Sequence, residues 1–181
     1  MKTYPQGRVS HAKRLAYNAS MLCAALAFSY LEAIAPISLV IPLPGVKLGL
    51  ANLAVMLTFF CLSPVDAAIV SFARIAISAL LFGSPVSFFF SLCGGALAYF
   101  SLWLSKPILK LGKISFIGVS VISSALHSFG QIVAASAVYG TGAWFYLPII
   151  LLASAPVGAL VGQLLNILYP KTEKIIYENK K

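Results

Sequence analysis

The chain has 181 residues, of which 60% are hydrophobic and 9% are charged, and its formal net charge at pH 7 is +9. This composition excludes an ordinary water-soluble domain, while the length fits one domain. The basic residues flank apolar segments and form no stripe with interleaved aromatic side chains, which argues against a nucleic-acid partner. We therefore expect a single transmembrane domain over residues 1–181.

Apolar segments near the length that crosses a bilayer, about 20 residues, recur along the chain. The first, 15–35, is longer than a typical signal-peptide core and is expected to stay uncleaved. A proline-rich loop, 36–44, leads to a shorter second span, 46–62. Ser63 and Pro64 then suit the cap and first position of a helix, and Asp66 favours its positive end. This third span ends at 82, and three more are expected at 86–105, 114–139 and 144–169. The expected fold is an all-α bundle of six transmembrane helices.

The distribution of basic residues predicts the orientation of this bundle. Of the thirteen Lys and Arg residues, all but Lys47 and Arg74 fall in three clusters: Lys2, Arg8, Lys13 and Arg14; Lys106, Lys110 and Lys113; and Lys171, Lys174, Lys180 and Lys181. Six spans place these clusters on one side, which is cytoplasmic by the positive-inside rule. Segments 1–14 and 171–181 would then be basic cytoplasmic ends that contact anionic membrane lipid.

Six polar residues map to the middle or outer half of this bundle: Glu32, Lys47, Asn52, Arg74, His127 and Gln131. Ionisable groups at membrane depth are costly and usually functional. Arg74 lies about 12 Å from either surface, where it either pairs with Glu32 or binds an anion. His127 and Gln131 share a helix face, and they either fix packing or bind a ligand. Lys47 is an interfacial anchor or part of the same site. We expect a pocket for an anionic or amphipathic small molecule.

No metal site or disulfide framework is expected, because the three cysteines are an odd number at long spacing. No cofactor is expected either. Small residues at four-residue spacing mark two helix faces: Ala12, Ala16, Ser20 and Ala24 on the first span, and Ser154, Gly158 and Gly162 on the sixth. Such faces allow close helix approach in lipid. Both internal packing and docking of another membrane subunit are compatible with the pattern.

The segment 44–52, Pro-Gly-Val-Lys-Leu-Gly-Leu-Ala-Asn, together with Arg74 and the His127-x-x-x-Gln131 pair, resembles the family called heptaprenyl diphosphate synthase component I, or Gx transporter family. That family is similar to the substrate-binding subunits of energy-coupling factor (ECF) transporters. The resemblance implies a multi-pass protein of the bacterial plasma membrane that binds a micronutrient from outside. It also implies partners, namely a transmembrane coupling subunit, docked on the small residues of the first span, and two ATPase subunits.

The chain is not expected to be an enzyme by itself. Chain-elongating prenyl diphosphate synthesis needs paired aspartate-rich motifs to hold magnesium, but this chain has four acidic residues in all. It also lacks the phosphate-binding sequence Gly-x-x-x-x-Gly-Lys-Ser/Thr, so ATP-driven uptake requires partners. The first alternative is a noncatalytic membrane subunit associated with polyprenyl diphosphate synthesis or quinone metabolism. The second is a stand-alone secondary carrier, in which His127 would titrate.

Overall fold

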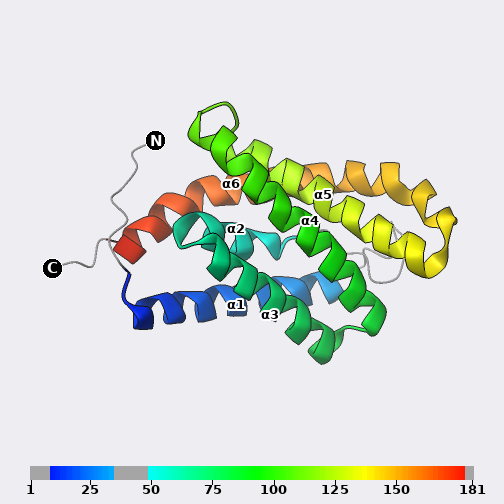
Figure 1. Cartoon of the computed structure of the whole chain (residues 1–181), viewed down its shortest axis with the longest axis horizontal. Coiled ribbons are helices and arrows are strands. Elements are labelled where there is room, and N and C mark those ends of the chain that lie inside the picture. The colour runs from blue at the N-terminus through cyan, green and yellow to red at the C-terminus, as the bar shows by residue number, and fades with distance from the viewer. Residues whose placement is uncertain (1–8, 35–48, 178–181) are drawn as a thin grey trace.

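The computed structural model describes residues 9–34 and 49–177, and this part of the chain is helical without strands (Figure 1). The α-helices are α1 (His11–Ile34), α2 (Asn52–Cys61), α3 (Pro64–Phe82), α4 (Pro85–Lys110), α5 (Phe116–Tyr139) and α6 (Leu147–Tyr177). A 3₁₀ helix, η2 (Thr141–Tyr146), precedes α6. The all-α class is thus confirmed.

Serine side chains begin three of these helices. Ser63 accepts a hydrogen bond from the backbone of Asp66 at the start of α3, and Pro64 holds the first helical position, as the sequence predicts. Ser84 caps α4 in the same way, followed by Pro85, and Ser115 caps α5 through the backbone of Gly118. Each cap satisfies a backbone donor that has no partner within its helix. The expected boundaries of these helices are correct to within a few residues.

The second expected span is wrong in its extent. Its helix, α2, has ten residues, which is about 15 Å and half the thickness of a hydrocarbon core. Gly49 has a φ of +91°, and the backbone of Asn52 donates to the Gly49 carbonyl across a turn (3.0 Å). The apolar run therefore turns before it becomes helical. Nine of the ten residues of α2 are buried, as expected for a helix that is apolar all round.

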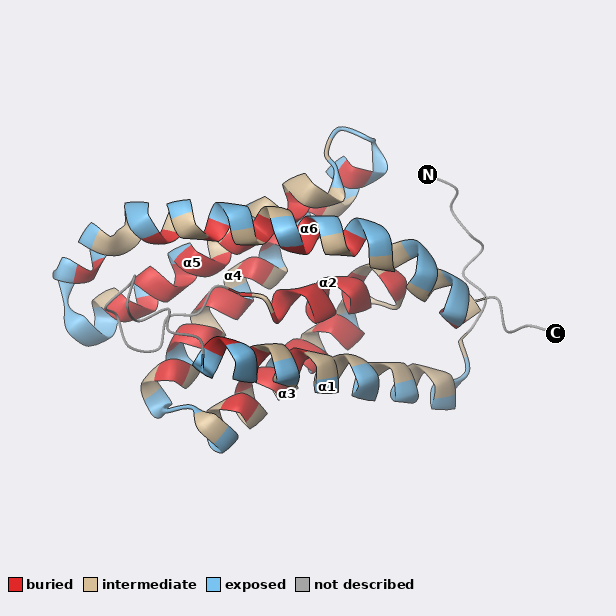
Figure 2. Ribbon diagram, turned by 180° about the vertical axis from the view of Figure 1, so that it is seen from behind, coloured by how far each residue is buried: buried red, intermediate tan, exposed pale blue. Residues whose placement is uncertain are grey.

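Helix α2 lies inside the bundle, and the longer helices surround it (Figure 2). It packs against α1, α3, α4 and α6. Helices α4, α5 and α6 form a closely packed layer on one side of α2. Helices α1 and α3 pack against each other on the other side of α2. The start of α1 and the end of α6 lie at the same end of the molecule (Figure 1).

Glycine allows the helix backbones to touch along α5. A Cβ atom on Gly130 would lie 2.6 Å from the carbonyl oxygen of Cys93 on α4. On α6, a Cβ on Gly158 would lie 2.8 Å from the Cα of Val121, and one on Gly162 would lie 2.5 Å from the Cα of Ile117. Real side chains do not fit at such distances, so these glycines set the spacing of the three helices.

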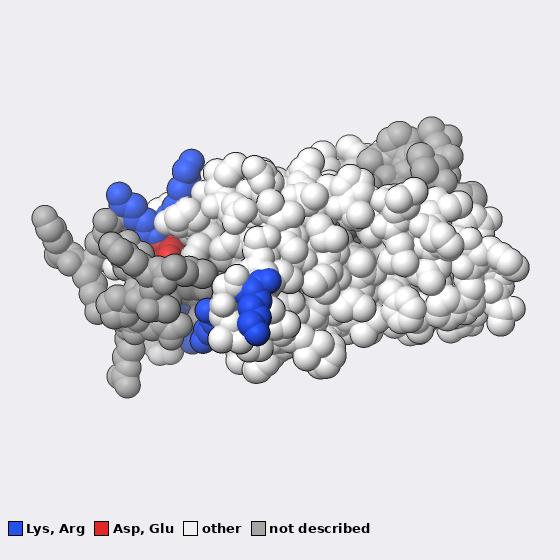
Figure 3. All heavy atoms as spheres, turned by 90° about the horizontal axis from the view of Figure 1, so that it is seen from above, with Lys and Arg blue, Asp and Glu red and all other residues white. Residues whose placement is uncertain are grey.

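Within the described residues, four helices are long and apolar enough to cross a membrane: α3, α4, α5 and the segment Thr141–Tyr177. The protein is accordingly a multi-pass membrane protein. Helix α1 is not among the four, although it has 24 residues. The described basic clusters gather at one end, as Figure 3 shows for one face. Helix α6 continues through the first part of the basic tail to Tyr177.

Candidate functional site

The Arg74 side chain is enclosed in the bundle and only partly satisfied. It lies on α3 and is 2% exposed. Its Nη1 donates a hydrogen bond to Ser29 Oγ on α1 (3.4 Å), whereas Nε and Nη2 have no hydrogen-bond partner. The ion pairs of the described residues do not include Arg74, although the charge of Glu32 acts on it. A buried guanidinium with two donors unused is costly.

His127 and Gln131 form a second buried group on α5. The His127 Nε2 and the Gln131 Nε2 are 2.7 Å apart in a hydrogen bond, as their shared helix face predicts. Gly94 of α4 makes room for this pair, because a Cβ there would lie 3.0 Å from the Gln131 Cγ and 3.0 Å from the His127 Cε1. The pair thus lies directly against the α4 backbone.

The turn before α2 contacts Glu32 of α1 and His127 of α5. Glu32 of α1 accepts a hydrogen bond from the backbone of Leu50 through Oε1 (2.6 Å). A Cβ on Gly49 would lie 3.0 Å from Asn52 Nδ2 and 3.3 Å from His127 Cδ2. The positive φ of Gly49 and this close approach both favour glycine. Asn52 Nδ2 is buried without a hydrogen-bond partner.

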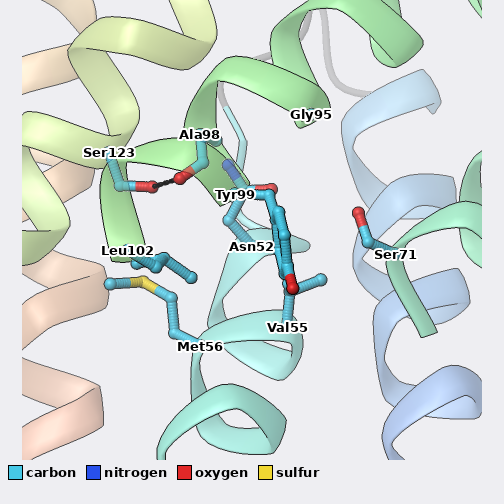
Figure 4. Close-up of a pocket in the computed structure, with 9 residues that line it drawn as sticks. All are labelled: Asn52, Val55, Met56, Ser71, Gly95, Ala98, Tyr99, Leu102 and Ser123. Atoms are coloured by element: carbon cyan, nitrogen blue, oxygen red, sulfur yellow. Dashed lines mark hydrogen bonds between the residues drawn. The ribbon is translucent and has the colours of Figure 1, made fainter. Parts of the chain in front are cut away.

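Two adjacent glycines on α4 separate the arginine from the histidine. Gly94 faces His127, while a Cβ on Gly95 would lie 3.8 Å from Ser71 Oγ and 3.9 Å from Arg74 Nη2. Gly95 and Ser71 also line a void with Asn52 and Ser123 (Figure 4). This void is too narrow to admit a water molecule. We call this set of groups the buried polar layer. Its members are Ser29, Glu32, Gly49, Asn52, Ser71, Arg74, Gly94, Gly95, Ser123, His127 and Gln131.

The structure brings together the candidate residues that it describes. Each is at most 5% exposed, and five helices, α1 to α5, contribute to the layer together with the turn before α2. These residues are Glu32, Asn52, Arg74, His127 and Gln131. Lys47 lies outside the described residues. Sequence reasoning missed Ser29, Ser71 and Gly95, although Ser29 and Ser71 each precede a predicted residue by three positions, which places them on the same helix face.

A second polar cluster joins α1 to α3 at the basic end. The Arg14 guanidinium forms an ion pair with the Asp66 carboxylate (2.8 Å), and Asn18 Nδ2 donates to the same carboxylate (2.8 Å). The hydrogen bond to Asp66 raises the pKa of Arg14. The partner of Asp66 is therefore Arg14 and not Arg74.

The small-residue face of α1 is not packed inside the molecule over most of its length. Ala12, Ala16 and Ser20 are exposed, and Ala24 is half-buried. By contrast, Ser154, Gly158 and Gly162 of α6 are all buried. Internal packing therefore explains the stripe on α6 but not the stripe on α1.

A family model described as heptaprenyl diphosphate synthase component I matches residues 21–168. The chain belongs to that family. The matched range contains every described candidate of the buried polar layer but excludes Arg14. Neither the curated proteins nor the solved structures that were compared contain a match to the chain. For this member of the component I family, the roles of individual residues therefore rest on its own geometry.

Proposed function

We propose that the protein is the substrate-binding membrane subunit of an ATP-driven, ECF-type uptake transporter, and that the buried polar layer binds an anionic or amphipathic micronutrient. One observation carries the proposal: Arg74 is 2% exposed, and two of its nitrogen atoms lack a hydrogen-bond partner. Leaving a buried cation uncompensated costs several kcal/mol. A purely structural arginine has no reason to carry this cost. A binding site for an anion accounts for it, because the anion supplies the missing hydrogen-bond acceptors.

The charge distribution supports ligand binding from outside the cell. The described basic residues outside the buried polar layer belong to the start of α1, the end of α4, the α4–α5 connection and the end of α6, which gather toward one end of the bundle (Figure 3). We assign that end to the cytoplasm by the positive-inside rule, with the bacterial plasma membrane as the location. Glu32 lies near the last residue of α1 and accepts a hydrogen bond from Leu50, which supports a layer toward the end opposite the basic residues, the outer side in this proposal.

The exposed stripe on α1 supports a partner subunit. Ala12, Ala16, Ser20 and Ala24 would let a helix of a transmembrane coupling subunit approach α1 closely in lipid. Because the chain lacks the ATP-binding sequence Gly-x-x-x-x-Gly-Lys-Ser/Thr, the energy must come from two ATPase subunits bound to that coupling subunit. In this proposal the protein itself is not an enzyme.

A second function is favoured by the family description, in which component I is a part of heptaprenyl diphosphate synthase. The protein would then be a noncatalytic membrane subunit that associates with a soluble prenyltransferase. Four acidic residues in the whole chain do not supply the paired aspartate motifs that hold magnesium on a diphosphate. The catalytic groups would have to come from the partner.

Co-purification distinguishes these two functions. The tagged protein is extracted from its native membrane in mild detergent, and the bound proteins are identified by mass spectrometry. We expect two ATPases and a membrane subunit, and we expect Ala16→Leu to lose them because leucine prevents close helix approach. Ala155→Leu is the matched control, since Ala155 is exposed on α6. Recovery of a prenyltransferase without ATPases would contradict the transporter and support the accessory subunit.

A further inference from the structure

The void beside Arg74 is polar at one end and apolar at the other. Asn52, Ser71 and Ser123 line the polar end, and the Ser123 hydroxyl already donates to the Ala98 carbonyl (3.3 Å; Figure 4). Val55 and Met56 of α2 and Tyr99 and Leu102 of α4 are among the residues that line the rest. A ligand that fills such a space needs one polar end and an apolar body.

The unused hydrogen-bonding atoms around the polar end include three donors without an acceptor. Nε and Nη2 of Arg74 are adjacent on one edge of the guanidinium, and Asn52 Nδ2 lies on the α2 side; all three are buried without a partner. The Arg74 edge matches the two oxygen atoms of a carboxylate, which it binds with two parallel hydrogen bonds. The missing partner is therefore an acceptor group with two oxygens in one plane.

The charge of the layer limits the charge of the ligand. Among the described residues, Arg74 is the only buried Lys or Arg, and Glu32 is a buried acid. Arg74 supplies one positive charge, on which the charge of Glu32 already acts, so a ligand with a single negative charge adds the least net charge to the layer. A diphosphate would bring at least two negative charges into a low-dielectric site, and its extra charge would have to be desolvated without a described cation beside it.

We propose that the buried polar layer binds an amphipathic monocarboxylate, with its carboxylate on Nε and Nη2 of Arg74 and its apolar body between α2 and α4 beside Val55, Met56 and Leu102. The inference rests on the proposed function and names the chemical class of its ligand. Because the void is narrower than a water molecule, binding requires α3 to separate from α4. Helix α4 packs much more extensively against α5 than against α3, so the α3–α4 side opens more easily.

Gly95 provides a variant that acts on the void more than on the fold. A Cβ there would lie 2.9 Å from Ile75 Cδ1, the flexible tip of a side chain that can move, and 3.9 Å from Arg74 Nη2. Gly95→Ala therefore places a methyl group where the carboxylate would meet the guanidinium. Gly142→Ala is the matched control, because a Cβ on Gly142 meets no atom within 4 Å.

The test measures the thermal stability of the full-length protein in detergent with millimolar hexanoate, 3-phenylpropanoate, their uncharged amides, hexyl phosphate or isopentenyl diphosphate. We expect at least one carboxylate to raise the melting temperature by about 2–4 °C at saturation, because a ligand stabilises the folded state that binds it. The amides, the phosphate and the diphosphate should have no effect. Arg74→Lys keeps the charge but loses the paired donors, and it should weaken carboxylate binding about 10- to 100-fold. Gly95→Ala should do the same, and Gly142→Ala should bind like the wild type.

Stabilisation by isopentenyl diphosphate or hexyl phosphate without carboxylates would overturn the inference, and so would equal stabilisation by an amide and its acid. No response to either carboxylate, or unchanged binding by Arg74→Lys, would overturn it too. The co-purification experiment distinguishes failure of this inference from failure of the proposed function. If ATPases co-purify with the protein but carboxylates do not stabilise it, the transporter proposal holds and only this ligand class is excluded.

Discussion

The first and last helices of the bundle both carry small residues at four-residue spacing, yet only the last packs them against a neighbour. On α6, Gly158 and Gly162 lie so close to the α5 backbone that side chains would not fit. On α1, Ala12, Ala16 and Ser20 face outward. The spacing indicates that close approach is possible, but it does not identify the helix that approaches. Glycine, which allows backbones to touch, is confined to the buried stripe.

The two helices also differ in the balance of their contacts. Helix α6 packs closely on α5, whereas α1 combines the apolar packing of Tyr17, Met21 and Phe28 on the core with polar contacts at both ends. Near its start, Arg14 and Asn18 bind Asp66; near its end, Glu32 accepts from Leu50, and Ser29 accepts from Arg74. A helix attached in this way can leave one face free for a partner.

The largest effect is expected from Gly162→Leu, which tests the α5–α6 side of the comparison. A Cβ at this position would lie 2.5 Å from the Cα of Ile117, so the backbones must separate. We expect a loss of about 3 kcal/mol or more in the free energy of unfolding, seen as a lower melting temperature or as loss of folded protein in gel filtration. Ala155→Leu, on the exposed side of the same helix, should leave the melting temperature unchanged. Equal behaviour of the two variants would refute close packing as the force that holds α6.

A smaller effect is expected from Asp66→Asn, which weakens the attachment of α1. The amide keeps the shape of the side chain but loses the ion pair with Arg14, whose side chain is 42% exposed. Because solvent screens such a pair, we expect a loss of about 1 kcal/mol, measured by thermal denaturation in detergent. Lys113→Gln removes a charge from an exposed position at the same end and should change little. If both variants have the stability of the wild type, the Arg14–Asp66 pair does not hold α1.

The smallest effect on stability is expected from Ala16→Leu on the exposed stripe. The free energy of unfolding should stay within about 0.5 kcal/mol of the wild type, because the larger side chain meets no neighbour in the molecule. Thermal denaturation of the isolated protein measures this directly. A marked loss of stability would mean that the stripe packs within the chain, and would remove the argument for a partner on α1.

Much of the fold was predictable from local sequence. Ser63 and Pro64 predicted the start of α3, because capping and the fixed φ of proline act within one turn. The length of the second span was not predictable in the same way. Its apolar residues favour a span, and only the positive φ of Gly49 shows that the chain turns there. Glycine is compatible with both a helix and a turn, so the sequence does not decide between them.

The candidate site was predicted in part, because its charged and amide residues are rare inside an apolar chain. Arg74 and His127 stand out on composition alone, and depth along the predicted helices placed them together. The serines and glycines of the same site do not stand out, since such residues are common in membrane helices. That Gly94 faces α5 while Gly95 faces α3 depends on how α4 is rotated, which only tertiary packing determines.

The shortness of α2 has a consequence for how the protein is made. A ten-residue helix is too short to be released into lipid as a span of its own, and its residues are covered on almost every side by the other helices. We therefore expect α2 to reach its final position only after α3 to α6 have been synthesised and have assembled around it. The buried polar layer would then be completed as a late step of biogenesis, when α2, which follows α1 in the sequence, inserts into the assembled bundle.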